Sequence, residues 1–349
     1  MLNKVKFKDV VKRCHTKEDR FNTDKVYYVG GEHIQPNELK VLERGIIQGS
    51  TIGPMFYFGF KAGQILFVTR NPHLHKAALA DFDGICSEKT LVLETVDSSI
   101  LLQEYLELIM QSDAFWQYCE IHKSGSINYF INWSTLANFE FNLPSIEEQK
   151  SIADKVWAAY ELKEAYKKMI AATDEMVKAQ FIEMFGNCKF KRQWKDVLTI
   201  TNGKAYKGEY LPSGTYPICG SAGIMGYGED KLCNKDTIIL GRKGNINNPI
   251  YMNVDYWIVD TAFSLCVNKE ILNPIFFYHW CKHFDFTKYN KQGVLPSLTK
   301  MDLETIEMMI PDIHLQNTFS EIAQQAEKSK SELRQAIEKI DRVMKSLMQ

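Results

Sequence analysis

Two segments of the chain carry a helical pattern of apolar residues that is much longer than a usual globular helix. The first, residues 145–185, contains no glycine or proline, and the second covers residues 316–349. Ser145 and Glu148 have the spacing of a capping box at a helix start, and Gly186 supplies a stop. At about 1.5 Å per residue, the first helix would be on the order of 60 Å long.

Apolar residues recur along the second segment at alternating spacings of three and four, interrupted only at Ser329. Such a heptad pattern lets a helix bury one narrow stripe against a partner of matching length. The chain contains one other helix this long, so the pattern predicts an intramolecular coiled coil; the alternative is two helices that each pack on their own domain. The expected seam consists of Ile152, Val156, Ala159, Tyr166, Ile170, Val177, Phe319, Ile322, Ala326, Leu333, Ile340, Val343 and Leu347.

The regions before each long helix mix short apolar runs with glycine-rich and proline-containing turns, which indicates α+β units and not βαβ repeats. In the first region we predict strands at 25–29, 65–69 and 90–94 and an amphipathic helix at 100–121. In the second we predict strands at 237–240, 250–252 and 262–267 and a helix at 274–283. The chain thus divides into 1–144, 145–185, 186–310 and 311–349.

The two halves of the chain echo each other, and the clearest echo is a motif directly before each long helix. It reads Leu-Pro-Ser-Ile-Glu-Glu-Gln at 143–149 and Ile-Pro-Asp-Ile-His-Leu-Gln at 310–316. Weaker echoes pair 7–10 with 194–197, 65–70 with 237–242, 91–93 with 265–267, and Gly125 with Gly293. A duplicated chain has pseudo-two-fold symmetry, which suits a target that also has two halves. Double-stranded DNA is the leading candidate.

Composition narrows the classes of protein that fit. The net charge is −1 and no segment is a polycation, so any DNA binding must depend on the local placement of basic side chains. No window approaches about 18 apolar residues, so we expect no transmembrane segment and no secretory signal. The 8 cysteines are scattered without a Cys-x-x-Cys pair, which favours a reduced, cytoplasmic protein.

Catalytic and metal-binding motifs are incomplete. The Asn-Pro dipeptides lack the second proline of an adenine methyltransferase loop, no Gly-x-x-x-x-Gly-Lys-Ser/Thr motif is present, and the paired histidines lack further ligands at matching spacing. We therefore assign the candidate segments to turns or structural positions, and expect no metal and no catalytic residue. These segments are 248–251, 273–276, His279 with His283, His73 with His75, and Asp81, Asp83, Glu88 and Lys89.

One loop has the composition of a DNA-contacting segment. Residues 241–245 read Gly-Arg-Lys-Gly-Asn after an apolar strand, and Arg, Lys and Asn reach base edges and phosphates while glycine permits close approach. Thr69-Arg70-Asn71 holds the same place in the first half, and 202–207 is a second basic loop. A charged surface turn is the alternative for each. The candidate DNA-binding residues are Arg70, His73, His75, Lys76, Lys204, Tyr206, Lys207, Arg242, Lys243 and Asn245.

The duplicated Leu/Ile-Pro-x-Ile-x-x-Gln motif resembles that of the specificity subunit of type I restriction-modification systems, where it ends a target-recognition domain and opens a long helix. Residues 241–244, Tyr256-Trp257, Asp260, Gly293 and Pro296 are also similar to the recognition-domain pattern. The first half departs from it, because Thr69-Arg70-Asn71-Pro72 lacks the usual glycine. The resemblance implies two recognition domains on an antiparallel coiled coil that fixes the spacing of a bipartite DNA target.

The resemblance also implies partners. The chain would be a non-catalytic subunit without a cofactor of its own. Two methyltransferase subunits with S-adenosylmethionine would dock on it, and restriction (motor-nuclease) subunits that use ATP and Mg²⁺ would complete a DNA-cutting complex. Two other readings stay open: a coiled-coil adaptor that does not read DNA, and a stand-alone DNA methyltransferase or nuclease.

Overall fold

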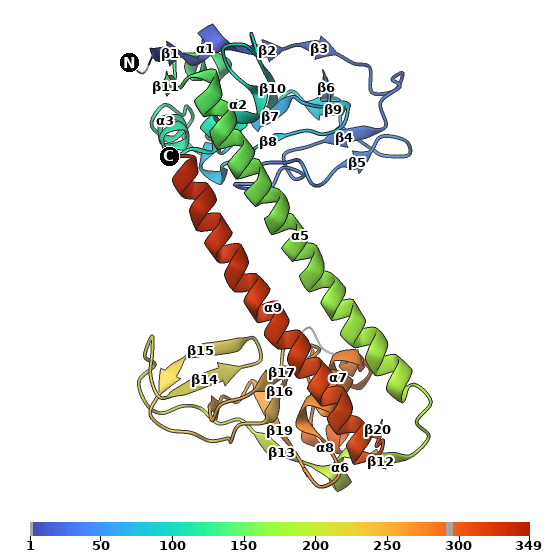
Figure 1. Cartoon of the computed structure of the whole chain (residues 1–349). Helices are drawn as coiled ribbons and strands as arrows, with labels where there is room; N and C mark the ends of the chain where they lie inside the picture. Colours follow the sequence, from blue (N-terminus) through green and yellow to red (C-terminus); the bar gives the residue numbers. More distant parts are fainter. Residues whose placement is uncertain (1–2, 291–295) are drawn as a thin grey trace. The chain divides into compact units, whose positions relative to one another are not determined.

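The computed structural model describes residues 3–290 and 296–349, so the expected echo at Gly293 lies outside the described residues. The chain forms two compact units: unit 1 comprises Met1–Lys167 and Arg334–Gln349, and unit 2 comprises Lys168–Leu333. Each unit contains sheets, short helices and parts of two long helices, α5 (Ile146–Phe185) and α9 (Ile313–Leu347), as Figure 1 shows. The α+β class predicted from the sequence is confirmed.

Unit 1 contains a four-stranded antiparallel sheet in the order β2-β10-β7-β8, formed by Val11–Cys14, Thr90–Thr95, Ile65–Val68 and Ala77–Leu79. A five-stranded sheet in the order β3-β6-β9-β4-β5 is formed by Thr16–Lys17, Phe56–Phe60, Gly84–Ser87, Tyr27–Val29 and Gly45–Ile46. Strands β1 (Asn3–Lys6) and β11 (Glu140–Leu143) pair separately. The helices are α1 (Phe7–Val10), α2 (Gln103–Gln111), α3 (Asp113–Ile121), α4 (Trp133–Leu136) and the 3-10 turn η1 (Pro72–Leu74).

Unit 2 repeats the four-stranded sheet in the order β13-β19-β16-β17, formed by Leu198–Asn202, Ala262–Val267, Thr237–Gly241 and Ile250–Met252. A three-stranded sheet in the order β15-β14-β18 is formed by Gly223–Gly228, Tyr216–Gly220 and Trp257–Ile258. Strands β12 (Lys191–Gln193) and β20 (Glu307–Met309) pair separately, as β1 and β11 do. The helices are α6 (Trp194–Val197), α7 (Pro274–His283), α8 (Lys300–Glu304) and the 3-10 turn η2 (Phe286–Tyr289).

The echo between residues 7–10 and 194–197 marks equivalent helices. Both α1 and α6 are single turns that follow the first strand of a unit, and each begins with a fully buried aromatic, Phe7 or Trp194. Phe7 packs among Phe115, Trp133 and Phe139, while Trp194 packs among Phe277, Trp280 and Phe286. Each aromatic therefore anchors the core of its own unit.

The single helix predicted at 100–121 is wrong. The chain forms α2 and α3, separated at Ser112, whose backbone is extended (φ −70, ψ 149). The Ser112 hydroxyl accepts a hydrogen bond from the amide of Phe115 and so caps α3. Apolar periodicity continues across the break because both helices bury their apolar faces in one core, and the sequence pattern therefore hid the serine cap.

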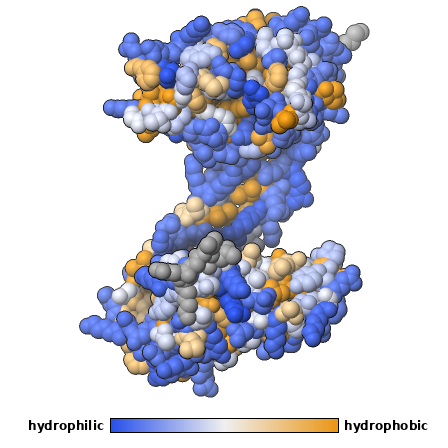
Figure 2. Space-filling view, turned by 180° about the vertical axis from the view of Figure 1, so that it is seen from behind, coloured by the Kyte–Doolittle hydropathy of each residue, from blue (hydrophilic) through white to orange (hydrophobic). Residues whose placement is uncertain are grey.

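The two long helices pack together as an antiparallel coiled coil, as predicted. In unit 1 the start of α5 packs on the end of α9, with Val156 and Tyr160 in one cluster with Met344. In unit 2 the end of α5 packs on the start of α9, with the rings of Phe181 and Phe185 centred 5.3 and 5.6 Å from that of Phe319. Figure 2 shows that hydrophilic residues predominate along the helices on the face it draws.

The buried seam of α9 agrees with the predicted one at alternate positions, and at the positions between them it is shifted by one residue. The buried positions after Phe319 are Ser320, Ala323, Ala326 and Lys330. Towards the end of the helix Met344 is 5% exposed while Val343 is 54% exposed. Val343 is therefore wrongly placed in the seam, and Ile322 lies at its margin beside Ala323. The apolar pattern missed this register because the register passes through a lysine.

Two lysines occupy equivalent places in the seam, one in each unit. In unit 2, Lys330 is 4% exposed, and its ammonium lies 2.5 Å from Asp174 Oδ1. In unit 1, Lys163 Nζ lies 2.8 Å from Asp341 Oδ1. The same number of residues separates the two lysines, the two aspartates and the repeated motif, so the chain uses one Lys–Asp pair twice. A polar side chain in the seam that has its partner on the facing helix restricts a coiled coil to one register, although both aspartates here are partly exposed.

The glutamine that ends the first copy of the motif joins α5 to unit 1. Gln149 is 0% exposed. Its carbonyl oxygen accepts from the Leu102 amide at 3.0 Å, and its amide donates to the carbonyl oxygens of Ile100 and Pro144. The preceding capping box is present, because Ser145 and Glu148 exchange hydrogen bonds between side chain and backbone.

The second motif makes the same connection in unit 2. Gln316 is also 0% exposed; it accepts from the Asn273 amide at 2.8 Å and donates to the carbonyl oxygens of Ile271 and Pro311. The motif therefore fixes each long helix to the loop that precedes α2 or α7. Among the described residues, no helix is long and apolar enough to span a membrane.

Candidate nucleic-acid interface

The candidate loop of unit 2 leaves the end of β16 as an extended segment held on both sides. On one side, the Arg242 amide donates to the Thr261 carbonyl oxygen at 2.8 Å. On the other, the Gly244 amide donates to Pro296 at 3.0 Å and the Leu298 amide donates to Arg242 at 2.9 Å. These backbone bonds fix the path of the loop without using a side chain.

The candidate loop of unit 1 follows the same path after β7. The Thr69 amide donates to the Lys89 carbonyl oxygen at 2.8 Å, the Asn71 amide donates to Tyr129 at 2.9 Å, and the Ile131 amide donates to Thr69 at 3.0 Å. The two units therefore share one backbone frame at the end of the central strand.

This frame corrects the alignment of the two halves by one residue. The equivalent backbone bonds make Thr69 the counterpart of Arg242 and Lys89 that of Thr261. Ile65 is then the counterpart of Ile238 and not of Thr237, and their strand partners Leu93 and Leu265 are equivalent, so the echo of 91–93 is 263–265 and not 265–267. Arg70 is consequently equivalent to Lys243, and not to Arg242 as the sequence echo indicated. The correction matters because a slip of one residue turns a strand side chain to the opposite face.

Glycine is required at both ends of the unit 2 turn. A Cβ atom on Gly241 would lie 2.0 Å from the Asn245 carbonyl oxygen, and Gly244 has a φ of +75°. The turn exposes Lys243 and Asn245, and half-buries Arg242, whose guanidinium lies 6.0 Å from the Phe263 ring centre.

The second basic loop of unit 2 leaves the sheet at the same edge. Asn202, the last residue of β13, pairs with Phe263, and Gly241, the last residue of β16, pairs with the neighbouring Ala262. The structure therefore brings the 203–207 loop and the 241–245 loop together at the start of β19.

Tyr206 is a structural residue of that loop, whereas its lysines are free to contact a ligand. The Tyr206 ring is centred 5.2 Å from that of Trp257, and its hydroxyl accepts from the Glu229 amide at 3.2 Å. The Trp257 indole donates to the Lys204 carbonyl oxygen at 2.8 Å, which holds the turn. Lys204 and Lys207 are exposed, and within the described ranges neither forms an ion pair with a carboxylate.

In unit 1, three of the four candidates have structural partners. The Arg70 guanidinium donates a long hydrogen bond to the Asn128 carbonyl oxygen at 3.5 Å. The His75 ring stacks on Trp116 at 4.7 Å, its Nδ1 lies 3.1 Å from Asn37 Oδ1, and burial lowers its pKa. The Lys76 ammonium donates to the Gly31 carbonyl oxygen at 2.6 Å. His73 is exposed, and Arg70 is half-buried, with its guanidinium 5.4 Å from the Phe130 ring centre.

Sequence reasoning missed residues that surround Arg70. A cavity of about 330 Å³ is lined by Arg70 together with Arg13 from β2, Lys89, Asn132 and Trp133, among others. No motif connects these residues, because they come from segments far apart in the sequence. The strand register gives no such signal either, because it sets Arg13 level with Ile65, the first residue of β7, whereas Arg70 follows the end of that strand.

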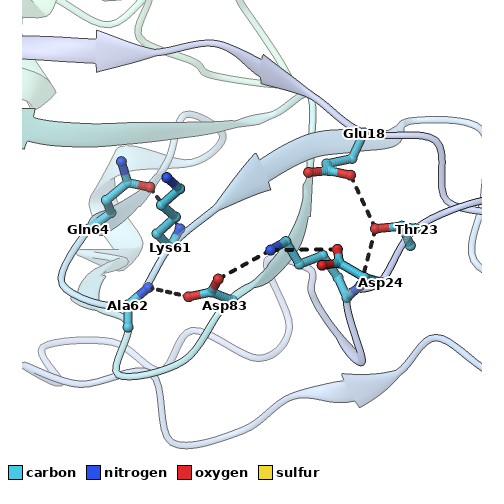
Figure 3. Close-up of polar contacts among 8 residues, drawn as sticks. Glu18, Thr23, Asp24, Lys61, Ala62, Gln64 and Asp83 are labelled. Atoms are coloured by element: carbon cyan, nitrogen blue, oxygen red, sulfur yellow. Dashed lines mark hydrogen bonds and ion pairs between the residues drawn. The ribbon is translucent and has the colours of Figure 1, made fainter.

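Two of the three carboxylates that could have indicated a nuclease have structural partners, and the third, Asp81, is exposed. Asp83 accepts from the Ala62 amide at 2.9 Å and pairs with Lys25 at 3.2 Å, in the polar network that Figure 3 shows. Glu88 is bound by Lys89 and by the Tyr57 hydroxyl. Among the described residues, no group of three or more His, Cys, Asp or Glu could hold a metal ion.

The paired histidines of α7 are also structural. His279 is 6% exposed, lies 5.1 Å from the Phe319 ring centre, and has its pKa lowered to about 3, chiefly by burial. The His283 ring lies 4.9 Å from that of Phe181. The two rings thus pack at the base of the coiled coil in unit 2.

Comparison with solved structures supports the fold. The type I restriction-modification S subunit from M. genitalium matches with a TM-score of 0.70 and 16% identity, covering 100% of this chain and 95% of that one. A structure described as showing complex assembly and conformational transition of the type I R-M system matches with a TM-score of 0.59 and 18% identity, covering 99% and 96%. A comparison with curated protein sequences gives no match.

The family comparison covers both halves. The model of the type I restriction modification DNA specificity domain matches residues 2–170 and again residues 189–341. Each match contains one backbone frame at the end of a central strand and one buried glutamine at the start of a long helix. The chain therefore belongs to the family of type I restriction-modification DNA specificity proteins.

Proposed function

We propose that this chain reads a bipartite DNA target, with one recognition site in each unit, as the non-catalytic specificity subunit of a type I restriction-modification complex. The observation that carries the proposal is the duplicated frame, which presents a basic segment at the same edge of both four-stranded sheets. Two similar readers in one chain suit two short sequences separated by a spacer.

The unit 2 site has the side chains that such reading needs. Lys243, Asn245, Lys204 and Lys207 are exposed at one sheet edge, and Arg242 lies beside them. Arginine, lysine and asparagine can form bidentate or phosphate contacts in the major groove, and a glycine-flanked turn lets the backbone approach the bases. Since the overall charge is −1, these local cations must supply the attraction to DNA.

Partner subunits would supply the catalysis. Two methyltransferase subunits that carry S-adenosylmethionine, and restriction subunits that use ATP and Mg²⁺, would assemble on this chain in the cytoplasm. Support for docking on the helices comes from α5, where Leu162, Met169 and Met176 are 44%, 52% and 51% exposed. They recur every seven residues, so α5 has a second apolar stripe outside the seam.

The test is to map adenine methylation in a host that expresses this chain with the methyltransferase encoded beside it. We expect a bipartite methylated motif that disappears when this chain is deleted. Methylation that persists without the chain, or that is absent with it, would instead favour the interpretation that the chain is a coiled-coil adaptor that does not bind DNA.

Two further measurements separate the alternatives. Purified chain that methylates DNA with S-adenosylmethionine alone would identify a stand-alone methyltransferase. A salt-sensitive shift of duplex DNA by the assembled complex is expected for a specificity subunit, and is not expected for an adaptor.

A further inference from the structure

The cavity beside Arg70 distinguishes unit 1 from unit 2. It lies where β7 ends and where Lys89 and residues 129–131 hold the extended segment. Arg13 enters it from β2, and Asn132 and Trp133 enter it from the start of α4. Four segments of unit 1 thus bring basic and amide side chains to one place, together with the carboxylate of Glu88.

The corresponding place in unit 2 lacks two of the cations. Arg13 pairs with Leu93, and Ile200 pairs with Leu265, which makes Ile200 the counterpart of Arg13. Lys89 and Thr261 accept the equivalent backbone bonds from Thr69 and Arg242, so Thr261 is the counterpart of Lys89. The frame therefore folds without these cations, and their presence in unit 1 needs a different explanation.

One carboxylate neutralises part of the charge. Glu88 pairs with Lys89 at 2.6 Å and accepts from the Tyr57 hydroxyl at 2.9 Å. Neither Arg13 nor Arg70 forms an ion pair with a carboxylate in the part of the chain that the structure describes.

The two guanidiniums instead lie near aromatic rings, and that of Arg70 also donates a long hydrogen bond to the Asn128 carbonyl oxygen at 3.5 Å. Arg13 is 5.7 Å from the Phe58 ring centre and Arg70 is 5.4 Å from that of Phe130. Burial lowers the pKa of Arg13, which means that its charge is poorly solvated where it stands. An incoming anion would restore what the guanidinium has lost in solvation.

We propose that Arg13 and Arg70, with Asn132 beside them, hold one phosphodiester group of the DNA that this chain binds. The proposal rests on the proposed function and adds a site to it. Two planar guanidinium forks match the several oxygens of a phosphate. A neutral guanine edge would leave two positive charges uncompensated, so a phosphate is the better match. A phosphate contact would position unit 1 on the duplex without reading its sequence.

The experiment compares variants of the full chain, assembled with its methyltransferase, in binding duplex DNA that carries the mapped motif. Arg13→Gln and Arg70→Gln should each weaken binding about 10- to 100-fold, in the range of a lost hydrogen bond to a charged group. Each should also reduce the slope of log affinity against log salt by about one. The methylated motif should not change.

Lys12→Gln is the matched control. Lys12 precedes Arg13 in β2, so its side chain points to the other face of the sheet, where it pairs with Glu94 at 2.8 Å. It also removes one positive charge, and we expect it to leave affinity and salt slope unchanged. Arg70→Gln lies outside the strands, so it tests the site even if Arg13→Gln impairs folding.

The possible outcomes are distinct. Unchanged affinity and salt slope in Arg70→Gln would overturn the phosphate site while leaving the proposed function intact. A methylated motif relaxed at one base pair would also overturn it, because that result identifies a base contact. Failure of the unmodified complex to bind any duplex would count against the proposed function itself.

Discussion

Units 1 and 2 share a backbone frame and differ in almost every side chain placed on it. In unit 2 two glycines form an open turn that exposes Lys243 and Asn245, whereas in unit 1 Pro72 follows the segment and Arg70 lies against a cavity. Backbone hydrogen bonds hold both segments. The frame therefore does not depend on its exposed side chains, and under the proposed function these side chains could differ to suit two different half-sites.

The ends of the coiled coil differ in a second way. In unit 2, Phe185 fills the space between Phe276 and Phe319, with ring centres 4.7 and 5.6 Å away. The glutamine contacts make Tyr105 and Ile152 the counterparts of those two rings. In unit 1 these counterparts line a cavity of about 550 Å³ together with Leu347 and Met348. In unit 2 a buried ring thus fills the place that borders a cavity in unit 1.

The largest expected effect comes from lengthening the helices that join the units. One heptad inserted near Met169, with another near Ala336 to keep the helices paired, adds roughly 10 Å. If the helices determine the spacer, the methylated motif should gain about three base pairs of spacer, at 3.4 Å per base pair. Methylation mapping gives the result, and an unchanged spacer would contradict the proposal that the helices act as a ruler.

The packing difference predicts a large contrast in stability. Phe185→Ala should reduce the free energy of unfolding by about 3–5 kcal/mol, because it empties a fully buried site. Met348→Ala should cost clearly less, since Met348 already borders a cavity. Urea denaturation of both variants measures the contrast, and equal losses would show that the two ends are packed alike.

The two buried glutamines make equivalent contacts, so replacing either one should lower the stability of the chain by a similar amount. Gln149→Ala and Gln316→Ala each leave a buried amide without its acceptor, and each should cost about 1–3 kcal/mol of unfolding free energy. Gln324→Ala, at an exposed position of α9, should change stability by less than about 0.5 kcal/mol. A loss confined to one glutamine would break the equivalence of the two motifs.

A buried carboxyl should make unit 1 sensitive to pH. Burial raises the pKa of Glu107 well above 4.5, and its Oε2 has no hydrogen-bond partner. The stability contributed by the neutral form is present below the unfolded pKa and is lost as pH rises through the folded pKa. Glu107→Gln does not titrate, so the stability of this variant relative to the native chain should increase as pH rises above about 4.5.

Melting temperatures at a series of pH values test this prediction. Glu104→Gln, on the exposed face of the same helix, is the control and should track the native chain. If both variants behave alike, Glu107 is ionised in the folded state and its burial carries no pH dependence.

The smallest expected effect is a gain in the free energy of unfolding. Met348 is the counterpart of Phe181, and Met348→Phe should partly fill the unit 1 cavity and stabilise the chain by about 0.5–2 kcal/mol. A loss of stability in urea denaturation would mean that the cavity is too narrow for a ring, as overpacking usually costs energy.

The sequence predicted features that depend on periodicity or on short motifs. The strands at 250–252 and 262–267, helix α7 and the pairing of α5 with α9 are found as expected. The errors have local causes: Ser112 caps a second helix inside a continuous apolar pattern, and Lys330 carries the seam through a polar position. The DNA contacts themselves remain a prediction.

The site around Arg70 shows why spatial clusters escape sequence analysis. Arg13, Lys89 and Asn132 have no common motif or spacing, and only the folded unit brings them to one cavity with Arg70. The strand pairing and the backbone bonds show that Arg70 corresponds to Lys243, whereas the sequence echo aligned Arg70 with Arg242, one residue earlier. Pairing between distant strands is information that a single sequence does not carry.

The short ladders β1–β11 and β12–β20 give each recognition unit the form of a cassette with adjoining ends. The strand that opens a unit pairs with the strand that leads into α5 or α9, for example Asn3 with Leu143. Because the first and last strands of a unit are paired, an insertion or deletion between them should not shift the start of the long helix. Such a joint would let the residues between the paired strands change in number while the helix that follows keeps its register.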